Sequence, residues 1–369
     1  MNSHDIEQEL ARHLAFLQQD ENNLSLLLKI STLYLELNDL SHAQHYIDKA
    51  KKIHSNACDA LQGFIYLNQD QIEKAQEAFE KARTYEDSDE LRYHLGFIYF
   101  MQQELSKAWD ILSSIEDTDY IPITQVLMAR ILQQQEQFEQ ALALLETHVK
   151  GFPDNAEALG LLALLYLDMD EEDKALDFSQ RALRLNPETY EAQVVDIMLR
   201  LVDQKANAEE IQQLLDVNPQ DSRLLFALGS LYMTEGSFDL AIDSFEQTIA
   251  IHPDFYDCYI ALGWCYLLND DLANARKTYQ KAVDLSNELA DGWGGLALIH
   301  ALEAQWESCD SLSKKALALS NDCFLIQVAQ LIEINHKDPK KAQPHLLKIL
   351  KDKNTPISQK LATLMNEFE

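Results

Sequence analysis

Glycine and proline are both scarce in this chain of 369 residues, with 10 and 8 copies. Proteins rich in strands and tight turns use more of both, so the shortage favours helices joined by short turns. No stretch alternates apolar and polar residues as a half-buried strand would. Hydrophobic residues make up 47% of the chain, which argues against disorder. These features predict an all-α protein.

Positive charge is also in short supply. The chain carries 61 acidic and 30 basic residues, for a net charge of −31. Such a field repels nucleic acid and anionic membranes, so neither is expected as a partner. Residues 154–271 hold 24 acidic and 6 basic residues, whereas residues 337–360 hold seven Lys and two Asp. The two regions have complementary charge, so homo-oligomer formation through the basic end is one expectation.

No segment has the pattern of an export signal or a membrane anchor. The first five residues have neither a basic region nor an apolar run. No stretch approaches the roughly 18 apolar residues of a membrane span. The five cysteines are odd in number and lack CxxC spacing, which favours reduced thiols over a disulfide framework. We expect a cytoplasmic protein, with export by a non-classical route left open.

The sequence motifs of common catalytic and metal sites are missing as well. GxSxG and HExxH do not occur, and no strand precedes the glycine-rich run 292–295. We therefore interpret that run as a packing feature inside a helix. His42 and His45 are three residues apart, but no third metal ligand is evident. The sequence predicts no enzyme activity, no metal and no cofactor.

One pattern, in contrast, occurs twice in succession. Residues 222–255 contain L-x2-LG-x2-Y, followed by A-x3-F and then P. Residues 256–289 contain Y-x2-LG-x2-Y followed by A-x3-Y, and Gly263 comes 34 residues after Gly229. This pattern resembles the tetratricopeptide repeat, a helical hairpin of 34 residues. One hairpin cannot bury its apolar face alone, so such repeats are stable only as a stack.

The resemblance implies an all-α solenoid, a right-handed superhelix of about ten hairpins with a capping helix at each end. Residues 1–23 are expected to form the first cap and residues 354–369 the second. Repeat six is degenerate, because Arg200 occupies its tyrosine slot and its flanking prolines are only 32 residues apart. We expect the array to bend there. The repeats are expected at 24–55, 56–88, 89–121, 122–155, 156–189, 190–221, 222–255, 256–289, 290–323 and 324–353, the last also degenerate.

In this family, positions two, five, nine and twelve of each first helix line a concave groove. In this sequence positions five, nine and twelve are largely apolar or aromatic, and position two is mostly acidic. The resemblance therefore implies a protein or peptide partner with apolar anchors and basic residues. Alternatively, several of these aromatic residues pack between adjacent repeats. The residues expected to bind the partner are Phe64, Tyr93, Phe97, Phe100, Arg130, Gln133, Met198, Arg223, Phe226, Met233, Ile260 and Trp264.

Two binding modes of the family lack their residues here. The carboxylate clamp uses Lys and Asn at positions five and nine, and the asparagine ladder uses Asn at position six; this chain has neither set. The leading hypothesis is a non-enzymatic scaffold or adaptor that binds a protein segment in the groove. A secretion or assembly chaperone for client proteins is an alternative, and a bacterial effector or regulator is another.

Overall fold

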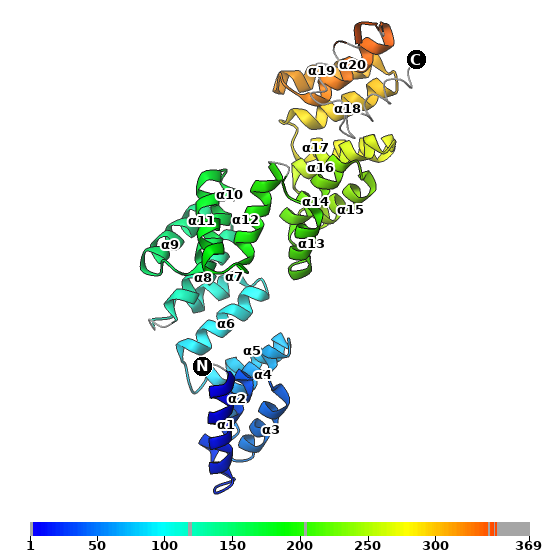
Figure 1. Ribbon diagram of the computed structural model, residues 1–369. Helices are drawn as coiled ribbons and strands as arrows, with labels where there is room; N and C mark the ends of the chain where they lie inside the picture. The colour runs from blue at the N-terminus through cyan, green and yellow to red at the C-terminus, as the bar shows by residue number, and fades with distance from the viewer. Residues whose placement is uncertain (1–2, 117–119, 203–204, 339, 343, 345–369) are drawn as a thin grey trace. The chain divides into compact units, whose positions relative to one another are not determined.

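The chain folds into helices joined by short turns, with no strand in the ranges that the computed structural model describes, residues 3–116, 120–202, 205–338, 340–342 and 344 (Figure 1). It is an all-α solenoid, as predicted. The expected C-terminal cap and most of the basic end, 337–360, lie outside these ranges. The helices are α1 (Ser3–Leu17), α2 (Leu24–Glu36), α3 (Leu40–Lys51), the 3-10 helix η1 (Asn56–Cys58), α4 (Asp59–Asn68), α5 (Ile72–Arg83), α6 (Asp89–Met101), α7 (Leu105–Leu112), α8 (Ile121–Gln134), α9 (Phe138–Gly151), α10 (Ala156–Asp168), α11 (Glu172–Leu185), α12 (Tyr190–Val202), α13 (Ala208–Val217), α14 (Ser222–Glu235), α15 (Phe238–Ile251), α16 (Tyr256–Leu268), α17 (Leu272–Leu285), α18 (Ala290–Leu302), α19 (Trp306–Leu319) and α20 (Phe324–Lys337).

The chain divides into two compact units, Met1–Ala192 and Gln193–Glu369. The division falls inside α12, at the repeat where we expected a bend, and the bend itself stays a prediction. Within the first unit, α1 to α11 pack in chain order, each against the next (Figure 1). Helices α13 to α20 do the same within the second unit. First helices of consecutive repeats also touch, as α6, α8 and α10 do, and they form what we call the first-helix face.

A glycine in the first helix of several hairpins lets the second helix approach closely. A Cβ added to Gly63 would lie 2.6 Å from the ring of Phe79 in the same hairpin, and one added to Gly295 would lie 2.3 Å from Tyr279 in the second helix of the preceding hairpin. The rings of Phe79 and Tyr279 are fully buried. Because α18 contains Gly295, the glycine-rich run 292–295 is a helix packing feature, as predicted.

Eight of the hairpin turns that the structure describes repeat one backbone geometry. At the end of α2, Asn38 has a positive φ of 57°, and the N–H of Asp39 donates to the carbonyl of Tyr34 at 2.8 Å. This left-handed residue, followed by a bond that reaches back five residues, is a Schellman motif, which satisfies carbonyls left over at the helix end. The left-handed residues are Asn38, Asp70, Gln103, Glu136, Asp170, Gly236, Asp270 and Ala304.

The five cysteines are buried and free. Burial raises the pKa of both Cys258 and Cys265 to about 12, so these thiols stay protonated and unreactive. Among the described residues, no helix is long and apolar enough to cross a membrane. Those same ranges contain no group of three His, Cys, Asp or Glu side chains that are placed to hold a metal ion.

Candidate functional site

Two helices of the first-helix face each present three side chains along one side. Helix α6 presents Tyr93, Phe97 and Phe100, and α8 presents a second set that ends in Arg130. In both helices the three positions are spaced i, i+4 and i+7, which places them in one row along a helix surface. Aromatic residues from repeat three therefore face a mixed row from repeat four.

These two rows enclose a cavity of about 310 Å³ in the first unit. Its size is at the lower end for ligand pockets, which suits one large side chain better than a whole small molecule. Ile123 is 40% exposed, and the other lining residues except Leu127 are half-buried or exposed, so the cavity opens to solvent. The cavity is lined by Tyr93, Phe97, Phe100, Ile123, Leu127, Arg130 and, from α10, Glu157.

Arg130 links three repeats at the polar end of this cavity. One terminal nitrogen of its guanidinium group donates to Glu157 Oε1 at 3.0 Å, and the other donates to Glu191 Oε1 at 2.5 Å. The side chain of Glu191 is 11% exposed, whereas that of Glu157 is 57% exposed. The set carries one positive and two negative charges. Glu157 is thus an accessible carboxylate in a cavity otherwise lined largely by aromatic and aliphatic side chains, in surroundings that favour a cation.

The charges shift the pKa values of the groups around the cavity. Burial alone lowers the pKa of Arg130, but the carboxylates of Glu191 and Glu157 more than offset it, so that pKa lies above its ordinary value. Burial raises the pKa of Tyr93, with a further contribution from Glu157. Both groups therefore keep their usual charge at neutral pH, and neither is activated for acid, base or nucleophilic chemistry.

Gly160 explains why Glu191 comes so close to Arg130. This residue lies one turn after Glu157 on α10. A Cβ added to Gly160 would lie 2.7 Å from the methyl group of Thr189, which precedes α12. Without a side chain at position 160, the start of α12 packs directly on α10. That contact brings Glu191 within reach of Arg130.

Two other predicted residues of the first unit lie next to the cavity lining. Phe64 on α4 is half-buried, with its ring edge-on to His94 at a centroid distance of 4.7 Å. Gln133 is one turn after Arg130 on α8, and its side-chain amide donates to Asp168 at 3.3 Å. Phe64 thus contributes to packing between repeats two and three, while Gln133 extends the polar end of the face.

The remaining predicted residues belong to the second unit. Met198, Arg223, Met233 and Ile260 are half-buried. Phe226 is also half-buried, and its ring lies 4.9 Å from that of Phe255. Of this group, Met198 lies on α12, Arg223, Phe226 and Met233 on α14, and Ile260 on α16.

Trp264 lies where we did not expect it. Its side chain is only 8% exposed and belongs to the core of the second unit. The ring of Phe324 from α20 meets it edge-on at 5.9 Å. Residues sixty positions further along the chain therefore cover Trp264, and we leave it out of the proposed binding surface.

Two functional features of the cavity were not among the predicted site residues. Ile123 occupies position two of repeat four, where most other repeats have an acidic residue, and it was not among the residues predicted to bind the partner. Glu157 and Glu191 were recognised as acidic position-two residues, but their pairing with Arg130 was not. The signal for that pairing is the recurrence of an acid at position two in consecutive repeats, downstream of an arginine at position nine.

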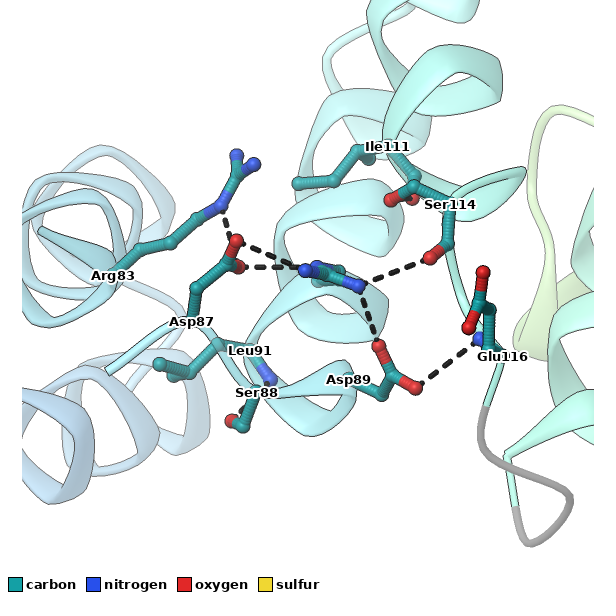
Figure 2. Close-up of polar contacts among 9 residues, drawn as sticks. Arg83, Asp87, Ser88, Asp89, Leu91, Ile111, Ser114 and Glu116 are labelled. Carbon is teal, nitrogen blue, oxygen red and sulfur yellow. Dashed lines mark hydrogen bonds and ion pairs between the residues drawn. The ribbon is translucent and has the colours of Figure 1, made fainter. Parts of the chain in front are cut away.

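A second arginine of the first unit, Arg92, also lies between two carboxylates. It makes two bonds to Asp87, at 2.9 and 3.0 Å, and one to Asp89 at 2.8 Å. It also donates to the carbonyl of Ser114 at 3.0 Å. Arg83 donates to the same carboxylate of Asp87 at 2.9 Å (Figure 2).

The surrounding contacts show that the Arg92 cluster organises backbone. Asp89 accepts from the N–H of Glu116 at 3.1 Å (Figure 2). Ser88 caps α6, since its hydroxyl accepts from the N–H of Leu91 at 3.4 Å. The cluster therefore fixes the start of α6 against the end of α7, and it lines none of the cavities described here.

Models of the tetratricopeptide repeat match three parts of the chain, residues 60–86, 120–188 and, in two overlapping segments, 208–254 and 226–290. The second segment contains Arg130, Glu157 and the half of the cavity that α8 and α10 form. The match at 60–86 contains Phe64.

Curated relatives are similar over two thirds of this chain. The bovine BBSome complex member BBS4 is 23% identical over 297 residues, covering 68% of this chain and 57% of the relative. The BBS4 homolog of Drosophila melanogaster is 21% identical over 284 residues, covering 68% and 58%. The chain thus spans somewhat over half the length of these relatives.

A solved structure, the APC/C hetero-tetramer Cut9-Hcn1, is similar with a TM-score of 0.56 at 14% identity. The similarity covers 98% of this chain and 87% of the other. It supports the fold alone.

Proposed function

Because the chain belongs to the tetratricopeptide repeat family, we propose that it is a non-enzymatic scaffold or adaptor that holds a segment of a partner protein. The segment lies on the first-helix face of repeats three to five. Its apolar anchors fill the cavity between α6 and α8, and its basic residues lie near the acidic position-two residues. The observation that carries this proposal is that Tyr93, Phe97, Phe100 and Arg130 line one open cavity.

The physical argument is that three aromatic side chains of α6 are only partly buried. Three aromatic side chains in one row would pack fully against neighbours if their only role were stability. Here they stay half-buried around an open space. Covering them with a partner's apolar side chain removes that area from water, and such central aromatic contacts supply most of the affinity in protein interfaces.

The comparisons support the same general role. The bovine relative is named as a member of a protein complex, the BBSome, so a protein similar to this chain over its repeats works inside an assembly. No observation on the described residues favours the chaperone or the effector alternative, and both stay predictions. Self-association through residues 337–360 stays a prediction too.

A site-specific photo-crosslinker tests the proposed face. We replace Ile123, at the mouth of the cavity, with p-benzoylphenylalanine and irradiate the native cells. The matched control carries the same residue in place of Leu176 on α11, which is 41% exposed against 40% for Ile123 and does not line the cavity. We expect a discrete protein adduct from position 123 that Phe97→Ala abolishes. Equal adducts from both positions, or none from position 123, would overturn the proposal.

A further inference from the structure

We propose that Glu157 selects the partner by its charge: the cavity takes a large apolar side chain of an extended segment, and Glu157 pairs with a Lys or Arg two residues away from that anchor. This inference rests on the proposed function, since it names the chemistry of the partner at the same site. It makes Glu157 a specificity-determining residue, and it makes Arg130 the residue that positions Glu157.

The exposure of the three charged groups supports this assignment. Glu191 is nearly buried and its Oε1 is taken by Arg130, so it is poorly placed to meet a partner. Glu157 spends Oε1 on Arg130, and its side chain is still 57% exposed. A carboxylate has several lone-pair directions, so one bond from Arg130 leaves Glu157 able to accept from a second cation.

The balance of charge decides between a basic and an acidic partner. An acidic residue or a C-terminal carboxylate would have to compete with two carboxylates for Arg130. It would also approach a chain with a net charge of −31. A basic residue meets a set with a net charge of −1 and is attracted by the wider field. The arrangement therefore favours a cation beside the anchor.

The size of the cavity sets the distance between the two features. At about 310 Å³ it holds one aromatic or branched side chain, and Glu157 is itself part of the lining. A cation that pairs with Glu157 must therefore come from a residue close to the anchor in the partner. In an extended segment, neighbouring residues point to opposite sides and every second residue shares a side. In a helix, residues three or four positions apart are also close in space, so a spacing of two positions in the partner distinguishes an extended segment from a helix.

Selection from a random 12-residue peptide display library on the full chain tests the inference. From the natural sequence we expect peptides with an aromatic or branched apolar residue and a Lys or Arg two positions from it. Glu157→Lys should keep the anchor and change the neighbouring preference to Asp or Glu, while Glu157→Gln should remove the charge preference. Peptides selected on the natural chain should bind the Glu157→Lys variant about tenfold more weakly, which combines a lost pair with a new repulsion.

Glu139→Lys is the matched control. Glu139 lies in the first turn of α9, is exposed and does not line the cavity, so this variant makes the same change of charge in the same unit. It should select the same peptides as the natural chain. A basic preference that persists in Glu157→Lys, or one that Glu139→Lys changes equally, would overturn the role of Glu157. Peptides with an anchor but no charge preference would refute this inference and leave the proposed function standing. If no peptides are enriched, or if Phe97→Ala has no effect, the proposed function itself fails.

Discussion

Arg92 and Arg130 make similar bonds in different surroundings. Their side chains are 24% and 25% exposed, and each lies between one exposed and one largely buried carboxylate. The partners of Arg92 are three and five residues away in sequence, whereas those of Arg130 are 27 and 61 residues away. The first cluster therefore stabilises a helix start, and the second ties repeats four and five to the start of α12.

The difference shows how a repeat array separates local stability from binding. Local ion pairs can be replaced by water when they break, because Asp87 is 41% exposed. The pair of Arg130 with Glu191 cannot, because the Glu191 side chain is only 11% exposed where the start of α12 meets α10. The cavity lies beside the second kind of contact. The proposed binding surface is thus supported by interactions that span several repeats.

Of the substitutions that separate the two arginines, Arg130→Met should cause the largest loss of stability. Methionine keeps the apolar stem but leaves the nearly buried Glu191 without its cation, and breaking such a pair costs about 3 kcal/mol. We expect a loss of that size in the free energy of opening of α8 and α10, measured by amide hydrogen exchange. Arg92→Met should cost about 1 kcal/mol or less, because its main partner remains hydrated.

The double variant Arg130→Met with Glu191→Leu serves as the control for this prediction. It removes the stranded carboxylate together with its cation, so most of the lost stability should return. If Arg130→Met costs no more than Arg92→Met, the two clusters are equivalent and the comparison fails. A double variant as unstable as the single one would show that Arg130 acts through packing rather than charge.

The same contrast explains which parts of the site could be predicted from sequence. A 34-residue period and a row of aromatics at fixed helical positions are local patterns, so the all-α solenoid and four of the cavity residues could be read from them. The pairing of Arg130 with Glu191 depends on Gly160, which lets α12 approach α10. No helical spacing encodes a contact across 61 residues.

For Trp264, the repeat position predicted a binding residue that the structure buries. Its position in the repeat is the same as that of Phe97, so sequence alone treats the two alike. In the second unit Phe324 packs against Trp264, while the cavity between α6 and α8 leaves Phe97 half-buried. Periodicity identifies the face on which a residue lies. Whether a later helix covers that residue depends on side-chain packing between repeats, which the period does not specify.

Acid should destabilise the surroundings of His94, beside the cavity, and the Arg92 cluster at different pH values. Burial against Phe64, Phe79 and Tyr93 lowers the pKa of His94 to about 4. In the unfolded chain its pKa returns to about 6.5, so the unfolded state binds the proton more readily and stability falls as the pH drops from 6.5 towards 4. By pH 5 the loss should be about 2 kcal/mol. Hydrogen bonds from Arg92 hold the pKa of Asp87 at about 2, so that contribution is present above pH 4 and is lost only as the pH falls towards 2.

His94→Leu isolates the first of these effects, since Leu61 and Leu127 occupy the same slot in the neighbouring repeats. Urea unfolding followed at pH 7, 6 and 5 should show that the variant loses about 2 kcal/mol less than the natural chain between pH 7 and 5. Burial also lowers the pKa of His148, but that contribution is common to both proteins and cancels in the difference. Identical pH dependence in the two proteins would contradict the assignment to His94.

The smallest expected effect concerns the turns that end the two arginine-bearing helices. Gln103 lies two residues after α6 and Glu136 two residues after α8, with φ of 62° and 57°. A side chain makes this left-handed conformation costly, and glycine relieves the cost while adding entropy to the unfolded chain. Gln103→Gly and Glu136→Gly should therefore each raise the free energy of unfolding in urea by roughly 0.5 kcal/mol.

The turn variants also test whether the contrast between the two arginines lies in their side chains alone. The backbone is the same in both turns, because Glu104 and Gln137 each donate an N–H to a carbonyl five residues earlier. The two gains should therefore agree, and Gly236→Ala at the equivalent turn should show the opposite sign. A clearly larger gain at Glu136 would mean that α8 carries backbone strain that α6 does not. The difference between Arg130 and Arg92 would then reflect that backbone strain as well as the two carboxylates that bind Arg130.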